Sequence, residues 1–326
     1  MKIASITITS DRSKIIGDAL RSVINHVDVM VFVDLGIDDA TYNVINEVKK
    51  DKEVFYTKCS PTKTTADWRN LGLKMASLVG ADYAIQLDTD ERMIFPSDFR
   101  QQLEQNPHIE IFCSLHVQGH YSKERVFRLP VNGEFQGHVH ETWTGDGACL
   151  MHGLFFDELI KSQETIDYNA KWMANGLLQQ AREDPTCHRW PFQLGLLYRA
   201  GNDPVKAFTF FKAAKRLQAA PEMKAIDCYE IALCCIDLGH PIPALRACVE
   251  GLQHHPGLAE LSHLAGVCCM KLGRLQEALC WSNMAIANGL YAGTSFAMNR
   301  AGLREPYSLW EGPFEMQRDI LKAMNA

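Results

Sequence analysis

The chain has 326 residues, of which 47% are hydrophobic and 22% charged, and its formal net charge is −6. This composition argues against disorder, and the acidic balance argues against a broad electrostatic surface for nucleic acid. The length is more than most single domains use and suits two domains. Since no apolar segment approaches the ~20 residues of a membrane-spanning helix, we expect no membrane span.

The first half, residues 1 to about 160, predicts a mostly parallel α/β sheet. Its segments follow the order strand, helix, strand, helix, strand, helix, strand at residues 3–9, 13–25, 29–33, about 39–50, 53–57, 67–79 and 84–87. The apolar run 29–33 ends at Asp34 and is typical of a parallel strand buried on both faces. This rhythm indicates βαβ units. From residue 109 to about 156, strands with Gly-containing turns indicate an antiparallel addition.

The second half, residues 161–326, predicts a helical solenoid. Three turn motifs, Gly201-Asn202, Gly239-His240 and Gly273-Arg274, each separate two apolar-periodic helices, and their spacings are 38 (239 − 201) and 34 (273 − 239) residues. Small residues follow each turn, at Ala207, Ala244 and Ala278, where they allow two antiparallel helices to approach closely. This pattern resembles the tetratricopeptide repeat.

The eleven cysteines do not predict a metal site. Two adjacent pairs, Cys234-Cys235 and Cys268-Cys269, lie in helical patterns, and no Cys-x-x-Cys motif is present. Neighbouring helical residues point in different directions, so these pairs are poor chelates. Buried free thiols fit a reduced protein, and the chain enters a strand-like pattern without a signal-peptide layout. We therefore expect a cytoplasmic protein.

The segment Leu87-Asp88-Thr89-Asp90-Glu91 carries the most chemical information. It follows an apolar strand pattern, so its carboxylates should lie at the carboxyl end of a strand, where open α/β sheets bind ligands. On an extended chain, Asp88 and Asp90 would point the same way. Such a pair of oxygen ligands suits Mg²⁺ or Mn²⁺ and, through the metal, a diphosphate. A solvated acidic turn is the alternative interpretation of this segment.

Several blocks, in order along the chain, resemble those of a family 2 glycosyltransferase of the GT-A fold that carries tetratricopeptide repeats behind its catalytic domain. The blocks are Ile6-Thr7-Ile8-Thr9, Val33-Asp34-Leu35-Gly36 with Asp38-Asp39-Ala40-Thr41, Trp68-Arg69-Asn70, Leu87-Asp88-Thr89-Asp90-Glu91, Arg125-Val126-Phe127-Arg128, Gly137-His138-Val139-His140-Glu141 and His152. The resemblance covers about residues 1–160 and the repeat architecture that follows. It implies a GT-A domain at 1–160, a repeat domain at 161–326 and transfer with inversion from a nucleotide-sugar.

The resemblance also implies a donor site. Asp90 would bind Mn²⁺ or Mg²⁺ directly and His152 would complete the protein's share of the ligands, while Asp88 would reach the ribose or a metal-bound water. Thr9 and Asp34 would lie together at the rim of the sheet, where Asp34 can accept from a uracil N–H or a ribose hydroxyl. This predicts a UDP-sugar as the donor, although an Asx turn explains Asp34 equally well.

Two further residues keep alternative roles. Arg69 can bind a phosphate or act as a structural clamp. For the general base that an inverting transfer needs, the resemblance points to Glu141, with His140 and Asp146 as the other candidates. Glu141 could instead be a carboxylate paired with Arg125 or Arg128.

The resulting prediction is a metal-dependent glycosyltransferase. Its acceptor is a hydroxyl or thiol on a peptide or protein, a saccharide or a modified nucleobase, held between the sheet domain and the repeats. The repeats could also form a homodimer surface. The alternative from another class is a non-catalytic scaffold with a relict sugar-nucleotide domain. A nucleotidyltransferase is less favoured, because Asp11-Arg12-Ser13-Lys14 lacks the glycines of a triphosphate loop.

Overall fold

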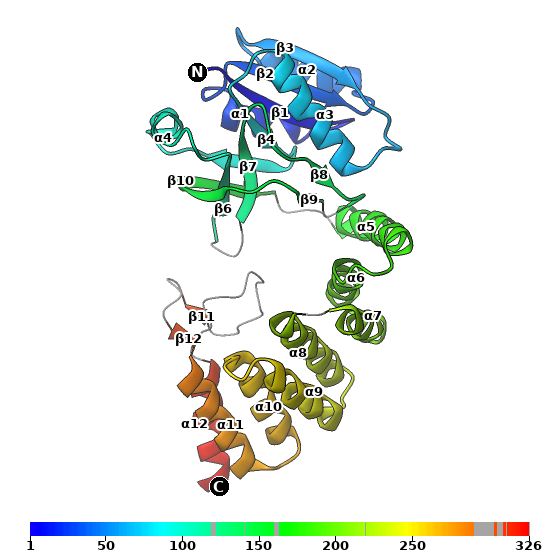
Figure 1. The fold of residues 1–326 in the computed structure, drawn as a ribbon, viewed down its shortest axis with the longest axis vertical. Coiled ribbons are helices and arrows are strands. Elements are labelled where there is room, and N and C mark those ends of the chain that lie inside the picture. The colour runs from blue at the N-terminus through cyan, green and yellow to red at the C-terminus, as the bar shows by residue number, and fades with distance from the viewer. Residues whose placement is uncertain are drawn as a thin grey trace. The chain divides into compact units, whose positions relative to one another are not determined.

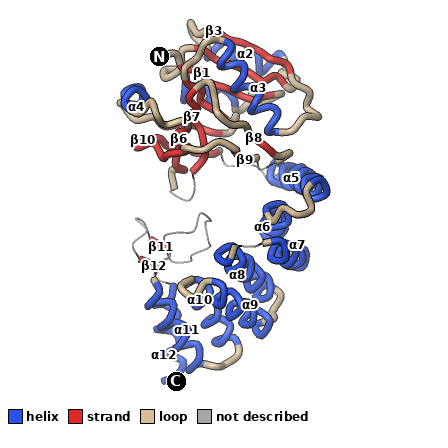
Figure 2. Tube along the Cα trace, viewed as in Figure 1, coloured by secondary structure: helices blue, strands red, loops and turns tan. Residues whose placement is uncertain are grey.

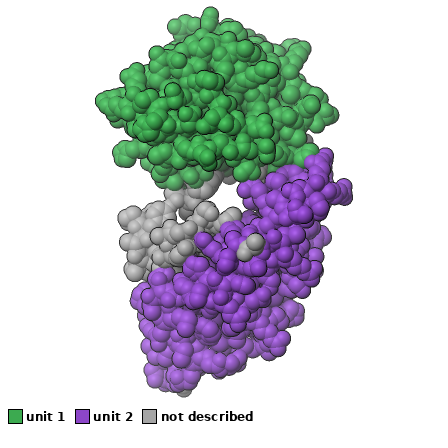
Figure 3. Space-filling view, viewed as in Figure 1, with its two compact units in different colours: residues 1–167 green, residues 168–326 purple. Residues whose placement is uncertain are grey.

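The computed structural model describes residues 1–118, 122–139, 141–159, 163–218, 220–289, 303–304, 309–310 and 312–325. It divides into two compact units, Met1–Asp167 and Tyr168–Ala326, which Figure 3 shows in different colours. Within the described ranges, no helix is long and apolar enough to cross a membrane.

The first unit is built on an eight-stranded sheet in the order β3-β2-β1-β4-β7-β6-β10-β5 (Figure 1). The strands of this sheet are β1 (Ile3–Thr9), β2 (Val29–Asp34), β3 (Glu53–Lys58), β4 (Tyr83–Leu87), β5 (Glu91–Ile94), β6 (Ile111–His116), β7 (Ser122–Arg128) and β10 (Ala148–Glu158). A separate pair joins β8 (Phe135–Gln136) to β9 (Thr142–Trp143). The helices of this unit are α1 (Ile16–Val23), α2 (Asp39–Val48), α3 (Thr65–Leu78) and α4 (Phe99–Gln105).

The sheet is mixed rather than mostly parallel. Strands β3, β2, β1 and β4 are parallel neighbours, as the βαβ rhythm predicts. Beyond β4, strand β7 runs antiparallel to both β4 and β6, and β5 runs antiparallel to β10. Only β10 and β6 restore a parallel pairing among these described strands. The addition expected after residue 109 is therefore confirmed in part: β6, β7 and β10 extend the sheet, with β7 antiparallel to both of its neighbours.

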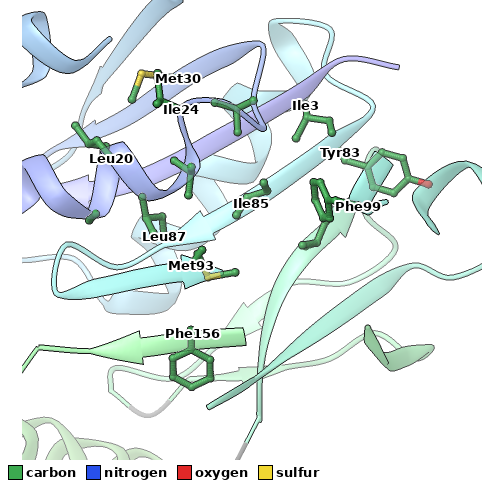
Figure 4. Packing of buried hydrophobic residues seen from close by; sticks show 14 of the residues in the cluster. Ile3, Leu20, Ile24, Met30, Tyr83, Ile85, Leu87, Met93, Phe99 and Phe156 are labelled. Carbon is green, nitrogen blue, oxygen red and sulfur yellow. The ribbon is translucent and has the colours of Figure 1, made fainter. Parts of the chain in front are cut away.

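Two apolar cores cover the two faces of the sheet, and the alternation along β2 assigns its side chains to them. Met30 and Phe32 belong to the core under α1, α2 and α4, part of which is drawn in Figure 4. Val29 and Val31 belong to the core under α3. Residues one apart on a strand point to opposite faces, so an unbroken apolar run serves both cores. This confirms that β2 is buried on both faces.

The described residues of the second unit form helices and one short strand pair, β11 (Leu303–Arg304) with β12 (Leu309–Trp310) (Figure 2). Its helices are α5 (Gln163–Glu183, which begins in the first unit), α6 (Arg189–Ala200), α7 (Pro204–Leu217), α8 (Pro221–Asp237), α9 (Pro241–His254), α10 (Ala259–Lys271), α11 (Leu275–Asn288) and α12 (Gly312–Asn325). Helices α6 to α11 form three hairpins whose turns lie where the repeat predicts them.

The three turns have the same backbone geometry. In each, one residue has a positive φ, at Asn202, Gly239 and Gly273. The next residue donates its backbone N–H to a carbonyl five positions earlier, which satisfies the end of the preceding helix. The first turn corrects the sequence alignment by one position, because Asn202 and not Gly201 takes the left-handed conformation. Asn tolerates that conformation better than most residues.

Small side chains bring the helices of each hairpin together. Ala207, Ala244 and Ala278 are all fully buried, as the repeat pattern predicts. The six cysteines at positions 228, 234, 235, 248, 268 and 269 are buried as well, and all eleven cysteines of the chain are free thiols. They fill the helical core as small apolar groups.

Candidate functional site

The carboxyl ends of β1, β2 and β4 bring the predicted donor residues to one edge of the sheet. Thr9, the last residue of β1, pairs with Asp34, the last residue of β2. Strand β4 pairs with β1 on its other side, and Asp88 follows its last residue, Leu87. The expected position of Asp34 beside Thr9 is therefore confirmed, while the roles of both in donor binding stay predictions.

Asp34 builds the turn into α2. Its Oδ1 accepts from the backbone N–H groups of Gly36 and Ile37, at 2.8 and 2.7 Å, and the Tyr42 hydroxyl donates to Oδ2 at 3.3 Å. Burial alone would raise the pKa of Asp34, but these hydrogen bonds hold it below its usual range. The Asx-turn alternative is thus realised, and Oδ2 is the oxygen with capacity for a further donor.

Asp88 lies between two arginines from different elements. Arg69 of α3 places its Nη2 at 3.2 Å from Oδ1, and Arg125 of β7 donates its Nη2 to Oδ2 at 2.8 Å. Burial alone would raise the pKa of Asp88, yet Arg69 and Arg125 hold it well below the usual range. Asp88 is therefore an ionised carboxylate held between two guanidiniums, and its Oδ2 accepts from Arg69 Nη2, at 3.5 Å, as well as from Arg125. Arg69 thus acts as the clamp that one of its two predicted roles required.

The two arginines belong to a row of seven charged side chains with alternating sign, which we call the charge ladder. Its members in order are Glu141, Arg69, Asp88, Arg125, Glu91, Lys123 and Glu158, each in contact with the next. Glu91 is fully buried and Arg125 nearly so. Lys123 and Arg125 are two apart on β7, so both reach Glu91 from one face of the sheet.

The turn between β4 and β5 corrects the expectation that Asp88 and Asp90 lie on an extended chain and point the same way. The backbone N–H of Glu91 donates to the carbonyl of Asp88 at 3.1 Å, and β5 starts at Glu91. Residues 88–91 thus form a turn, and the alternation of an extended strand does not apply to Asp88 and Asp90. Asp90 is partly buried, and its carbonyl accepts from the backbone N–H of Leu159 at 2.9 Å.

The carboxylate of Glu141 contacts two side chains of α3. Arg69 Nε donates to its Oε1, and Thr65 Oγ1 donates to its Oε2 at 3.0 Å. Burial alone would raise its pKa, but Arg69 and these hydrogen bonds hold it below the usual range. Glu141 therefore anchors Arg69, which corrects the predicted pairing with Arg125 or Arg128, while its role as the general base stays a prediction.

The other two base candidates are not brought to this site by the described residues. Asp146 precedes β10, whose Ala148 pairs with Ile111 of β6. Ile111 and Ala84 both pair with the same residue of β7, one on each side of that strand. Ala84 is near the start of β4, so this end of the sheet is the edge opposite to Asp88. Asp146 is therefore on the wrong edge for this site, and His140 lies outside the described residues.

His152 is separated from Asp90 by the length of β5, which corrects the predicted metal pair. Its carbonyl accepts from Gln102 of α4 at 3.1 Å, and the next residue, Gly153, packs against Pro96 beyond the end of β5. Asp90 lies before the start of β5. Four strand residues span roughly 13 Å, whereas ligands of one cation lie within about 2.6 Å of it.

The helical unit carries an open groove of about 390 Å³ along α9. Its lining residues are Ile242, Leu245, Arg246, Val249, Glu250, Gln253 and Arg274. Ile242 is 53% exposed, so the groove offers apolar area beside two cationic side chains.

No protein-family model matches the chain, and no curated protein matches it. Among solved structures, the first TPR domain of Spaghetti (RPAP3), bound to an HSP90 peptide, is 13% identical over 43% of this chain and 94% of its own, with a TM-score of 0.34. PcrH in complex with the chaperone binding region of PopD is 18% identical over 42% and 92%, with a TM-score of 0.34. The Arabidopsis OM64 TPR domain is 16% identical over 41% and 94%, with a TM-score of 0.33. These likenesses are too distant to carry a conclusion about function.

Proposed function

We propose that the first unit is a GT-A-type glycosyltransferase domain that takes a sugar from a UDP-sugar in a metal-dependent reaction. The observation that carries the proposal is the edge where β1, β2 and β4 end, because Thr9, Asp34 and the Asp88–Asp90 turn meet there. Ligands of open α/β sheets bind at this edge. Oxygen donors on neighbouring loops suit the ribose and diphosphate of a nucleotide-sugar.

The residues present fit a cation held jointly with a diphosphate. Within the described ranges, no three His, Cys, Asp or Glu side chains form a cluster that would hold a metal alone. Mg²⁺ does not need one, because it is commonly bound by one or two carboxylates and by substrate phosphates. Asp90 would hold the cation, which would neutralise charge on the departing diphosphate. Asp88 is already neutralised by Arg69 and Arg125, so we assign it to the ribose or to a metal-bound water.

We propose that the helical unit binds the acceptor. The surface of this unit favours a peptide or protein as that acceptor. Stacked helical hairpins present an extended surface to peptides. The groove along α9 adds exposed apolar area at Ile242, beside the charged side chains of Arg246, Glu250 and Arg274. Eleven free thiols support a cytoplasmic setting for the reaction.

Donor hydrolysis tests the proposal. The full chain is incubated with a panel of nucleotide-sugars and Mn²⁺, and release of nucleoside diphosphate is measured for the wild type, Asp90→Asn and Asp146→Asn. We expect release from a UDP-sugar that falls at least tenfold in Asp90→Asn, the loss typical of a changed metal site. Asp146→Asn is the matched control, since this exposed carboxylate lies at the opposite edge. Absence of release or binding for every donor, or equal loss in both variants, would refute the proposal.

A further inference from the structure

The charge ladder extends well beyond the residues that a donor would touch. Arg125 is 3% exposed and uses one nitrogen, Nη2, for both Asp88 Oδ2 and Glu91 Oε1. In the described part of the chain, neither Arg125 Nε nor Glu91 Oε2 has a hydrogen-bond partner. Leaving such buried atoms unpaired is costly, and buried ion pairs often add little net stability. The ladder is therefore poorly explained as a device for stability.

We propose that Arg125 is a positioning residue for Asp88, and that Glu91, Lys123 and Glu158 hold Arg125 in place. This inference rests on the proposed donor site. Asp88 lies in the turn that follows β4, so the strand itself does not fix the direction of its carboxylate. Arg125 from β7 donates to Oδ2 at 2.8 Å, and Nη2 of Arg69 from α3 lies 3.2 Å from Oδ1 and 3.5 Å from Oδ2. The two guanidiniums approach the carboxylate from different elements and together fix its direction. Strand β7 thereby supports a residue that the β4–β5 turn alone would leave mobile.

The neighbouring members of the charge ladder hold Arg125 itself in place. Glu91 is fully buried at the start of β5 and accepts from both Arg125 and Lys123. Lys123 in turn donates to Glu158, and its Nζ lies 4.8 Å from the centre of the Phe156 ring. The guanidinium of Arg125 lies 5.8 Å from the same ring. Glu91 and the Phe156 ring therefore hold Arg125 on one side, and Asp88 is its contact toward the proposed donor edge.

A double-mutant cycle tests this role, with UDP and Mn²⁺ as the probe and titration calorimetry as the measurement. The variants are Asp88→Asn, the charge-neutral pair Arg125→Met with Glu91→Gln, and the three changes combined. Replacing both partners avoids an unpaired buried carboxylate. We expect each of the first two to weaken binding about 10- to 100-fold, as loss of a ligand-orienting partner does. The combined variant should bind no more weakly than Asp88→Asn, because Arg125 acts through Asp88.

The control is Arg128→Met with Glu110→Gln, another Arg–Glu pair, between β7 and the loop before β6, at the opposite edge. It should leave the affinity for UDP and Mn²⁺ unchanged. If the losses from Asp88 and Arg125 multiply, Arg125 contacts the donor itself and the positioning role is refuted. The same holds if the Arg125 pair variant binds like the wild type.

Folding is checked separately from binding. Amide exchange of β1 and β2 should be unchanged in the Arg125→Lys variant, which keeps the charge, and its affinity should lie between those of the wild type and the methionine variant. A lysine variant that folds but binds as weakly as the methionine variant contradicts the role. If the wild type binds no nucleotide at all, the proposed function fails and this inference fails with it. If the wild type binds UDP and Mn²⁺ but the Asp88 and Arg125 changes do not couple, only the positioning role of Arg125 is refuted.

Discussion

Gly72 of α3 controls how closely that helix approaches the sheet, and Arg69 lies one turn earlier on the same helix. A Cβ built at position 72 would lie 2.3 Å from Cγ2 of Ile6 on β1. Carbon atoms without a bond between them are comfortable at about 3.5–4.0 Å, so Gly72→Ala forces α3 or β1 to move by more than an ångström. Because Ile6 is fully buried within the sheet, its branched side chain has no free space to rotate into.

The expected cost follows from two opposing terms. Overpacking a tight core costs about 1–3 kcal/mol, and alanine recovers up to about 1 kcal/mol of helix propensity over glycine. We therefore expect Gly72→Ala to destabilise the first unit by about 1–2 kcal/mol. This corresponds to amide exchange about 5- to 30-fold faster in β1 and α3. Mass-spectrometric exchange on the full chain suits the question, because it reads each unit separately.

Two comparisons make the reasoning refutable. Gly251→Ala introduces a similar clash in the helical unit, 2.6 Å from Cδ1 of Leu261, and should accelerate exchange in α9 and α10 while leaving β1 unchanged. Ile6→Ala removes the clashing methyl, so the combined variant should cost less than the sum of the single changes. Unchanged or slower exchange in Gly72→Ala, or strict additivity with Ile6→Ala, would show that the contact does not limit the approach of α3.

Two other predictions concern pH and helix capping. Burial raises the pKa of Glu230 in α8 to about 7, so the folded state keeps a proton that the unfolded state releases, and stability falls as pH rises from about 4.5 to 7. Glu230→Gln should therefore leave stability unchanged near pH 4.5 and raise it by as much as about 3 kcal/mol at pH 8, measured by urea unfolding of the helical unit; a larger gain at the acidic end would contradict this sign. Thr64 caps α3 and forms a capping box with Asp67, so Thr64→Ala should cost about 1 kcal/mol and accelerate exchange in the first turn of α3, whereas exchange as slow as in the wild type would rule out the cap.

The pattern of apolar residues predicted the parallel part of the sheet and the helical hairpins, because both depend on local periodicity. The run 29–33 is typical of a strand buried on both faces, and the turns near Gly239 and Gly273 required residues that tolerate positive φ. The short strand β5 was not predicted. It consists of four residues directly after an acidic turn, and its pairing with β10 joins segments more than 60 positions apart.

The sequence by itself determined which side chains lie at the ends of the strands, because Thr9, Asp34 and Asp88 stand at or directly after the end of an apolar strand pattern. Only the tertiary structure decided which charges meet. Glu141 contacts Arg69 across 72 positions, and Arg125 contacts Asp88 across 37, through strands whose order no local pattern specifies. It also separated His152 and Asp146 from the edge that holds Asp88. Local periodicity indicates which segments are strands and which face each side chain takes, whereas the partner of a charged side chain depends on which strands become neighbours.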